Sequence, residues 1–433
     1  MNVLTHDALL IRGGRVIDPY TGRDGIADLA IVGGIITTHA PKDAVALDAT
    51  GLIVCLGLMD IHVHLREPGQ THKDTIATGT AAAVAGGFTY VACMPNTRPP
   101  LDHPDSIRFV LECAQATGYC TVGPVAAVTR GRAGREITDF ASLQAAGAVA
   151  FSDDGDGVED DAVMRAAFVS AKRCDAVLIQ HCEYKSVSAG GVMHLGDVSR
   201  RLGLPGLDPR SEEAMIERDI DLCRETGGRY HVAHISTARA IELVRRAKAD
   251  RLPVTAEVCT HHLVLTDEAC AASDPNTKMH PPLRPAADVE ACRRGLLDGT
   301  IDCLVTDHAP HTAEEKARGF LKAPPGIVGL ETAVGLAAKA MIETGLAAWP
   351  RVITWLTSGP AGVLGLSPRP VEPGQPANLT LIDPVAAWIV DPTGFESTGR
   401  NTPFAGWELV GRAVGVVRDR RTMGIAADRF DRP

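Results

Sequence analysis

The sequence predicts an α/β fold, a (β/α)8 TIM barrel with a small β-sandwich domain built from both chain termini. The chain has 433 residues, which is too long for one small domain. Short apolar strands with glycine turns fill its first 55 residues and return after about residue 365. Between them, an apolar strand followed by a loop and a helix recurs. We therefore expect residues 1–55 and 365–433 to build the sandwich and residues 56–364 to build the barrel.

The first part of the chain reads as hairpins. Predicted strands over 8–11 and 15–17 flank Gly13 and Gly14, and strands over 28–32 and 35–37 flank Gly33 and Gly34. Short strands at this spacing with glycine between them are typical of β-hairpins.

Eight strands are expected in the barrel, near 56–65, 88–95, 119–128, 148–154, 175–183, 229–236, 253–262 and 302–310. Helical patterns lie between most of them. The stretch 211–223 has Ser211 as its expected N-cap, acids in its first turn and an apolar stripe at helical period, and 237–248 is similar. After residue 370, a turn leads to a short strand ending near 383, and two more strands are expected over 407–410 and 413–417.

Several of the predicted barrel strands end in histidine or aspartate. An apolar run ends in His62-Val63-His64, and residues two apart on a strand face the same way, with Cβ atoms roughly 6.5 Å apart. Taken alone, such a pair is more often a surface or core feature than a metal site. Other strands, however, end in Asp153-Asp154, His181, His234 and Asp307. Because functional residues of these barrels lie at the carboxyl ends of the strands, the pattern predicts a metal centre, with zinc the usual ion for such ligands.

Composition indicates a globular enzyme, with 45% hydrophobic and 22% charged residues. A net charge of −10 argues against a nucleic-acid surface or a basic membrane-binding face. The eleven cysteines show no Cys-x-x-Cys spacing, and several lie in apolar runs (Cys93, Cys182, Cys259, Cys303), so we expect reduced, buried thiols. With no signal-like segment and no apolar run of spanning length, we expect a cytoplasmic enzyme.

Longer motifs resemble the amidohydrolase superfamily, and more closely the dihydroorotases of the bacterial class I type. They are DIHVHLREPG at 60–69, GGFT at 86–89, MPNTRP at 94–99, SDDG at 152–155, HCE at 181–183, HVAHIS at 231–236, PPLR at 281–284 and TDHAPH at 306–311. The His-Val-His element alone marks only the superfamily. The combination of HLREPG with MPNT is much more specific, and the resemblance extends across the whole predicted barrel.

The resemblance implies reversible cyclisation of N-carbamoyl-L-aspartate to L-dihydroorotate with loss of water, a step of pyrimidine biosynthesis. It implies one or two Zn²⁺ per subunit, with His62, His64, His181, His234 and Asp307 as ligands. Many relatives bridge two metals with a carboxylated lysine, but residues 151–155 contain no lysine. We assign the bridge to Asp154, with Asp153 as the alternative.

The resemblance also suggests roles in chemistry and substrate binding. Zinc would lower the pKa of a bound water toward ~7, and Asp307 would act as general base and then acid. Arg66 and Asn96 would bind the substrate carboxylate, although Arg66 could instead form a surface ion pair with Glu67. The expected substrate-contacting set is His64, Arg66, Asn96, His280, His311, Pro325 and Gly326.

The chain departs from the family pattern in that set. His280 stands where relatives often carry Asn, and Pro325-Gly326 stands where Phe-Gly is common. His231, His261 and His262 are expected to be structural rather than metal ligands, and the polar stretch 311–320 to be a mobile lid or a flanking loop.

Two other functions remain open at this point. One is another cyclic amidohydrolase, such as a hydantoinase, dihydropyrimidinase or allantoinase, whose substrates offer no carboxylate for Arg66 and Asn96. The other is a non-catalytic scaffold for aspartate transcarbamoylase, which the full set of expected ligands disfavours. A catalytic protein could also associate with aspartate transcarbamoylase or with further copies of itself, and the sequence decides neither.

Overall fold

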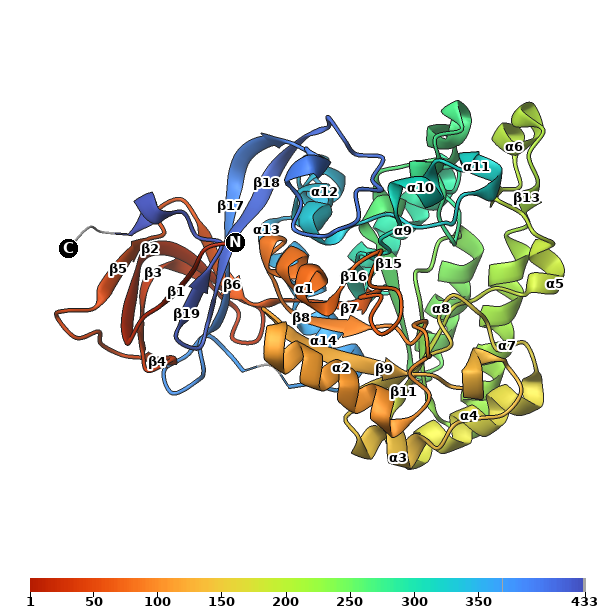
Figure 1. Ribbon diagram of the computed structural model, residues 1–433, viewed down its shortest axis with the longest axis horizontal. Coiled ribbons are helices and arrows are strands. Elements are labelled where there is room, and N and C mark those ends of the chain that lie inside the picture. Colours follow the sequence, from red (N-terminus) through yellow and green to blue (C-terminus); the bar gives the residue numbers. More distant parts are fainter. Residues whose placement is uncertain (368, 431–433) are drawn as a thin grey trace.

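The computed structural model describes residues 1–367 and 369–430, and it has two parts (Figure 1). A sheet built from both ends of the chain, drawn in red and blue, lies beside a barrel whose helices surround its strands. Within the described residues, no helix is both long and apolar enough to cross a membrane.

The predicted barrel is confirmed. In the described residues, eight strands pair in parallel in the order β16-β15-β14-β11-β10-β9-β8-β7. They are β7 (Leu58–Val63), β8 (Phe88–Cys93), β9 (Thr121–Ala126), β10 (Ala150–Phe151), β11 (Val177–Gln180), β14 (Arg229–Val232), β15 (Val254–Cys259) and β16 (Cys303–Val305). Each lies inside its predicted range, and the predicted ranges extended into the loops that carry the polar residues.

Helices follow most of the strands. They are α1 (Ile76–Ala85), α2 (Pro104–Thr117), α3 (Phe140–Ala145), α4 (Asp161–Arg173), α5 (Lys185–Ser188), α6 (Asp197–Leu202), α7 (Arg210–Thr226), α8 (Ala238–Ala249), α9 (Ala286–Asp298), α10 (Ala313–Lys316), α11 (Gly319–Lys322), α12 (Ala333–Ala337), α13 (Trp349–Leu356) and α14 (Ser358–Leu364). A small parallel pair, β12 (Met193–His194) and β13 (Gly206–Leu207), lies in the long loop before α7.

One helix start was predicted correctly and one was wrong. Thr237 is the N-cap of α8, and its side chain accepts a hydrogen bond from the amide of Ala240. Ser211 is not the N-cap of α7, because the helix already begins at Arg210. The N-cap position is held by Pro209, and the carboxylate of Asp208 accepts the Arg210 amide at 2.9 Å just ahead of the helix.

The barrel closes through one backbone bridge and one buried side chain rather than through a strand ladder. Among the described residues, β7 and β16 share no run of paired residues, only the bridge between Val63 and His308 and a bond from the His64 amide to the His308 carbonyl at 2.9 Å. The buried Asp60 carboxylate completes the joint: Oδ1 accepts the His62 amide at 3.0 Å and Oδ2 accepts the Thr306 amide at 3.1 Å.

The small domain contains strands from both termini, as predicted. In the described residues its sheet has nine strands, in the order β1-β19-β18-β17-β6-β2-β3-β4 with β5 paired to β2. They are β1 (Val3–Thr5), β2 (Ala8–Asp18), β3 (Arg23–Val32), β4 (Ile35–Thr37), β5 (Val45–Asp48), β6 (Ile53–Leu56), β17 (Asn378–Ile389), β18 (Glu408–Arg418) and β19 (Arg421–Met423). The sheet is strongly curved, so that β4 lies near the segment before β17. There the Ile36 amide donates a hydrogen bond to the Gln375 carbonyl at 2.8 Å.

Two predicted breaks in this domain are wrong. Gly13, at φ +67°, lies in a β-bulge inside the continuous strand β2, so the strands expected over 8–11 and 15–17 are one strand. The strands expected over 407–410 and 413–417 are likewise one strand, β18. The predicted hairpin at Gly33 and Gly34 does form, between β3 and β4.

Alternate residues of β6 join the two parts. Val54 and Leu56, together with Leu52 just before the strand, point into the core of the small domain. Ile53 and Cys55 point the other way, into the large core that contains the barrel helices. The chain then crosses from the small sheet to the barrel at residue 57; the domain limits at residues 55 and 365 stay predictions.

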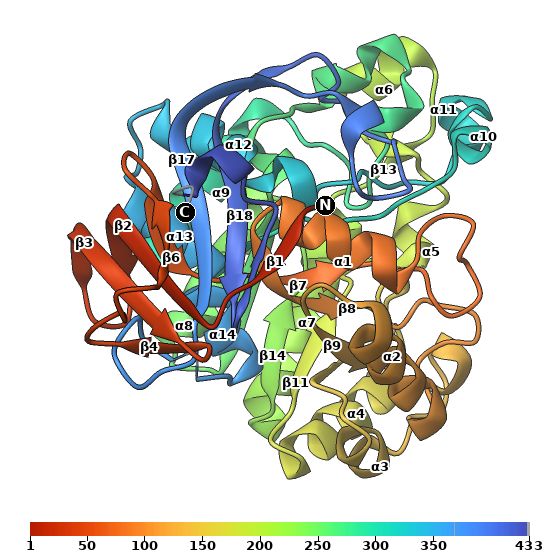
Figure 2. The same cartoon turned by 60° about the vertical axis from the view of Figure 1, so that its left-hand side comes forward.

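The hairpin of β17 and β18 is longer than the predicted short strands. Its first half pairs with β6, and its far half runs past α12 toward the mouth of the barrel (Figures 1 and 2). The segment 390–407 at its tip therefore reaches the loops that follow the barrel strands.

Candidate metal centre and active site

A cavity of about 220 Å³ lies at the carboxyl ends of the barrel strands. Its walls contain every residue predicted to contact substrate: His64, Arg66, Asn96, His280, His311, Pro325 and Gly326. They also contain five of the six predicted metal ligands: His64 again, with Asp154, His181, His234 and Asp307. The remaining predicted ligand, His62, is fully buried directly behind this wall.

The Asp154 carboxylate lies between two groups of imidazoles. Its Oδ1 is 3.2 Å from His62 Nε2, 3.6 Å from His181 Nδ1 and 3.5 Å from His234 Nε2. Its Oδ2 is 3.5 Å from His64 Nε2. The two oxygens thus face different histidines, which is the arrangement that a carboxylate bridging two metal ions requires.

Asp307 completes the cluster on the side of His62 and His64. Its Oδ1 is 2.9 Å from His64 Nε2 and 3.7 Å from His62 Nε2. Separations of this size match neighbouring ligands around a zinc ion with bonds of about 2.0–2.2 Å.

Unpaired polar atoms show that these residues fit a metal. His62 Nε2 and Asp154 Oδ1 are fully buried, yet neither has a hydrogen-bond partner within the described part of the chain. Burying such atoms without a partner is unfavourable, and a metal ion would satisfy both. Although burial opposes ionisation, His62 and the other imidazoles hold the Asp154 pKa well below its usual value, so it is a carboxylate.

Asp153 is engaged elsewhere. One of its carboxylate oxygens accepts the Thr129 amide at 3.1 Å and the other accepts the Thr129 hydroxyl. This geometry favours Asp154 over Asp153 as the bridging residue.

Three residues of the site have left-handed backbones: Arg66 (φ 62°), His234 (φ 31°) and Asp307 (φ 47°). Such conformations are unfavourable for residues other than glycine, and they are concentrated at functional sites. In each case the chain turns sharply just after a strand, which directs the side chain into the barrel mouth.

Glu257 on β15 orients the histidines and was not predicted. Its Oε1 is 2.5 Å from His62 Nδ1 and 3.2 Å from the His234 amide, and its Oε2 is 3.1 Å from His231 Nε2. A carboxylate on the far nitrogen fixes the tautomer of a metal-binding histidine. The sequence signal was present, because Glu257 is a charged residue inside an apolar strand.

Asn96 orients a second histidine. Its Oδ1 is 2.8 Å from His64 Nδ1. Its amide nitrogen is left to face the cavity beside Gly155, so the predicted contact with substrate stays compatible with this geometry.

Arg66 and His311 form a cationic corner of the cavity. Arg66 does not pair with Glu67: its Nε donates to the Pro310 carbonyl at 3.1 Å and its Nη2 lies 3.3 Å from His311 Nε2. Burial lowers the Arg66 pKa to about 10, which still leaves it charged at neutral pH. Burial and the Arg66 charge lower the His311 pKa to about 2, so this imidazole is neutral.

His280, Pro325 and Gly326 also line the cavity. Burial lowers the His280 pKa to about 4, so its ring is also neutral. Gly326 has φ +143°, and a Cβ there would lie 2.9 Å from the Ala309 carbonyl oxygen. Only glycine therefore fits at this position.

Asn401, at the tip of the β17–β18 hairpin, holds these walls together and was not predicted. Its Oδ1 accepts the His311 amide at 2.9 Å. Its Nδ2 donates to the carbonyls of Ala309 at 2.9 Å and Gly326 at 3.0 Å. No local sequence pattern links residue 401 to a barrel loop about 90 positions earlier, so sequence reasoning had no signal for it.

The segment expected as a lid or flanking loop forms α10 and the start of α11. Lys316 anchors it, with its ammonium donating to the carbonyls of Pro275 at 3.0 Å and Pro324 at 2.9 Å. Pro324 precedes the cavity-lining Pro325, so this segment contacts the wall of the site.

The chain is similar to known proteins over most of its length. A family model described as Dihydro-orotase-like matches residues 51–240. The chain is 50% identical over 407 residues to a dihydroorotase of Pelotomaculum thermopropionicum, covering 93% of this chain and 95% of that protein. It is 47% identical over 418 residues to a dihydroorotase of Anaeromyxobacter dehalogenans strain 2CP-C, covering 95% and 96%.

Solved structures resemble it in fold. An L-hydantoinase from Arthrobacter aurescens superposes with a TM-score of 0.84 at 22% identity, covering 96% of each chain. A dihydropyrimidinase from Brevibacillus agri also gives 0.84 at 22% identity, covering 96% of this chain and 95% of that one.

Proposed function

The chain belongs to the dihydroorotase family of the amidohydrolase superfamily, and from that premise we propose how its barrel mouth performs the family reaction. It is a cyclic amide hydrolase that interconverts N-carbamoyl-L-aspartate and L-dihydroorotate plus water. Hydantoinase, dihydropyrimidinase and allantoinase activities fit less well, because the relatives at 47–50% identity over nearly the whole chain are dihydroorotases.

One observation supports the assignment of roles most strongly. The cationic corner of Arg66 and the carboxylate of Asp307 face the same cavity of about 220 Å³. L-Dihydroorotate combines a carboxylate with a ring amide, and hydantoin or dihydrouracil lacks that carboxylate. A guanidinium donates two parallel hydrogen bonds to a carboxylate, which would orient the ring with its amide toward Asp307.

We propose that His62, His64, Asp154, His181, His234 and Asp307 hold one or two Zn²⁺. When bound, the metal would polarise the amide carbonyl and acidify a water. Asp307 is the general acid–base residue: in ring opening its carboxylate takes the proton of the attacking water and delivers it to the leaving ring nitrogen. Ring closure uses the same carboxylate in reverse.

The remaining cavity residues bind and orient the substrate in this proposal. Arg66 and the Asn96 amide nitrogen hold the carboxylate, and neutral His311 and His280 offer ring nitrogens to the amide groups. Pro325 and Gly326 line the wall and limit the ring's position.

We also propose a cytoplasmic location and association with aspartate transcarbamoylase or with further copies of the chain. The convergence of all six proposed ligands on one point argues against a non-catalytic scaffold.

The test is hydrolysis of L-dihydroorotate followed in the ultraviolet on protein of known zinc content, beside hydantoin, dihydrouracil and allantoin. We expect turnover of dihydroorotate alone, and a loss of about 10²–10⁴-fold in kcat for Asp307→Ala. Turnover of another ring instead would show that Arg66 does not select the substrate. If zinc-loaded protein turned over nothing, aspartate transcarbamoylase would be added before the proposed chemistry is rejected.

A further inference from the structure

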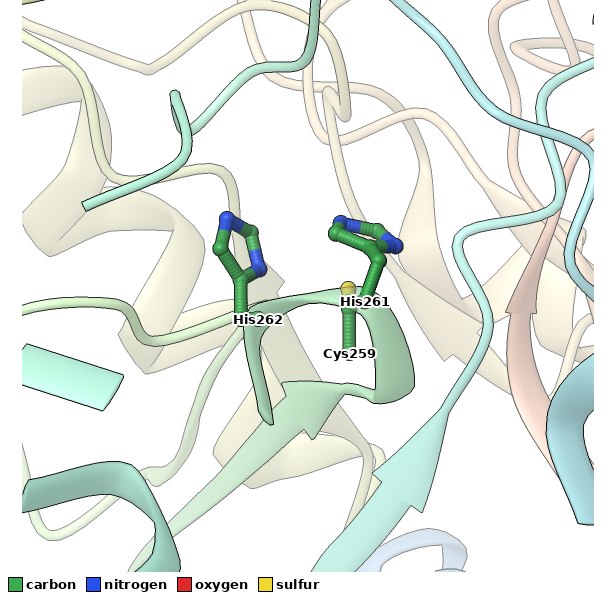
Figure 3. Close-up of side chains that lie close together, drawn as sticks. All are labelled: Cys259, His261 and His262. Atoms are coloured by element: carbon green, nitrogen blue, oxygen red, sulfur yellow. The ribbon is translucent and has the colours of Figure 1, made fainter. Parts of the chain in front are cut away.

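A second cluster of ligand-type side chains lies just after β15, outside the walls of the catalytic cavity. It consists of Cys259, His261 and His262, of which Cys259 ends the strand and the two histidines belong to the 3₁₀ turn Thr260–Leu263 (Figure 3). All three are buried, with exposed fractions of 0%, 1% and 2%. The proposed dihydroorotase chemistry uses none of them.

The geometry of the cluster is that of a ligand set. One ligand atom from each residue lies within 4.8 Å of the other two. His261 Nε2 and His262 Nδ1 are buried without a hydrogen-bond partner in the described residues. The two rings lie side by side, with centroids 4.4 Å apart and planes tilted by 50°, and the Cys259 sulfur lies beneath His261.

The protonation of His262 follows from its other contact. Its Nε2 lies 3.1 Å from the carbonyl of Pro281, which can only accept, so Nε2 carries the proton. The pKa of His262 is lowered to about 4, mainly by burial, so the ring is neutral. Its Nδ1 therefore directs a free lone pair toward His261 and Cys259.

We propose that Cys259 Sγ, His261 Nε2 and His262 Nδ1 bind one zinc ion, distinct from the catalytic centre. Around tetrahedral zinc with bonds of about 2.0–2.1 Å to nitrogen and 2.3 Å to sulfur, neighbouring ligand atoms lie about 3.3–3.6 Å apart, within the limit seen here. Cysteine binds zinc as the thiolate, so the thiol proton passes to solvent when the metal binds. A thiolate with two imidazoles selects a borderline-soft ion over magnesium or calcium.

Another thiol-containing group nearby is a weaker candidate. His231, Glu257 and Cys303 also lie within ligand distance of one another. There, however, Glu257 and His231 already bond each other, and Glu257 also bonds His62. Their polar atoms are satisfied, in contrast to the unpaired nitrogens of His261 and His262.

The position of this site gives it a structural consequence. His262 fixes the turn 260–263 to Pro281, and the neighbouring His280 lines the catalytic cavity. A metal on His262 would hold that wall in place from behind.

Cobalt substitution tests the proposal directly. The protein is stripped of metal and reloaded with Co²⁺, and its near-ultraviolet spectrum is searched for a thiolate-to-cobalt charge-transfer band. The catalytic ligands offer only nitrogen and oxygen, so such a band reports a cysteine ligand. We expect the band in the natural protein, its loss together with one equivalent of metal in Cys259→Ser, and its retention in the matched variant Cys303→Ser.

Two results would overturn the proposal: cobalt-loaded protein without the band, or a band lost in Cys303→Ser and kept in Cys259→Ser. If Cys259→Ser fails to fold, X-ray absorption at the zinc edge of the unaltered holoenzyme decides. A sulfur neighbour at about 2.3 Å supports the site, and nitrogen and oxygen neighbours alone refute it.

Discussion

Glu257 gives the sharpest prediction at the scale of single residues. Its carboxylate contacts His62 Nδ1 at 2.5 Å, opposite the nitrogen that faces Asp154. Glu257→Gln keeps the size of the side chain and removes its charge, so we expect metal affinity to fall by about 10–100-fold. Competition with a chelator measures this. The control is Glu331→Gln. The half-buried Glu331 side chain accepts the backbone amides of Glu396 and Ser397, so its replacement should leave the metal affinity unchanged.

Arg66 gives a prediction about substrate binding. Arg66→Lys keeps a positive charge and loses the fork of donors, so we expect KM for L-dihydroorotate to rise by about 10–100-fold with metal content unchanged. Steady-state kinetics with zinc analysis measures both. The exposed neighbour Arg98 offers the matched control Arg98→Lys. An unaltered KM in Arg66→Lys would mean that the substrate carboxylate binds elsewhere.

Some residues of the site can be recognised from the sequence around them, and others only from contacts with distant parts of the chain. His62, His64, His181, His234 and Asp307 follow apolar strands directly, and barrel geometry brings strand ends together, so their convergence was predictable. The choice of Asp154 over Asp153 needed the Thr129 contact, which depends on a neighbouring loop. The orienting role of Glu257 likewise depends on pairing between strands that the sequence does not specify.

At the scale of elements, the tip of the β17–β18 hairpin acts as a strap over the site. Asn401→Ala would leave the His311 amide and the carbonyls of Ala309 and Gly326 buried without a partner. We expect stability to fall by about 1–3 kcal/mol and KM to rise, because two walls of the cavity lose their common anchor. Urea unfolding and kinetics measure the two effects. The exposed Thr398 supplies the control Thr398→Ala, and equal behaviour of both variants would contradict the strap.

Helices and strands were predicted correctly where a single sequence pattern is present. They were predicted poorly where a turn or cap residue conflicts with the pairing or capping that the fold adopts. The barrel strands are short apolar runs, and all eight were located. Gly13 signals a turn, but the strands on either side keep a continuous ladder with β3, so a bulge forms instead. Ser211 signals a helix start, but the helix already begins at Arg210, whose amide bonds the Asp208 carboxylate.

At the scale of the whole molecule, we expect the two parts to unfold together. Alternate residues of β6 enter both cores, and Ile382, Ala413 and Val416 of the hairpin lie in the core of the barrel. Calorimetry of the holoenzyme should therefore give one transition, with equal calorimetric and van't Hoff enthalpies. Two resolved transitions would show that the small domain is an independent unit.

The overall architecture was predictable because the strand-loop-helix repeat and the hairpins at both ends are visible in the sequence. The way in which the two ends meet was not predictable. The long hairpin and its strap depend on contacts between residues more than 300 positions apart, such as Leu58 with Thr380.

The joint between β7 and β16 should be the place where the barrel opens locally. There the amides of His62 and Thr306 are protected by one carboxylate, Asp60, whereas amides of β11 and β14 lie in a continuous ladder. Hydrogen–deuterium exchange should therefore begin at this joint rather than in the ladder between β11 and β14. Asp307 and His64 flank the same joint, so the carboxylate proposed for proton transfer lies where we expect the barrel to open first.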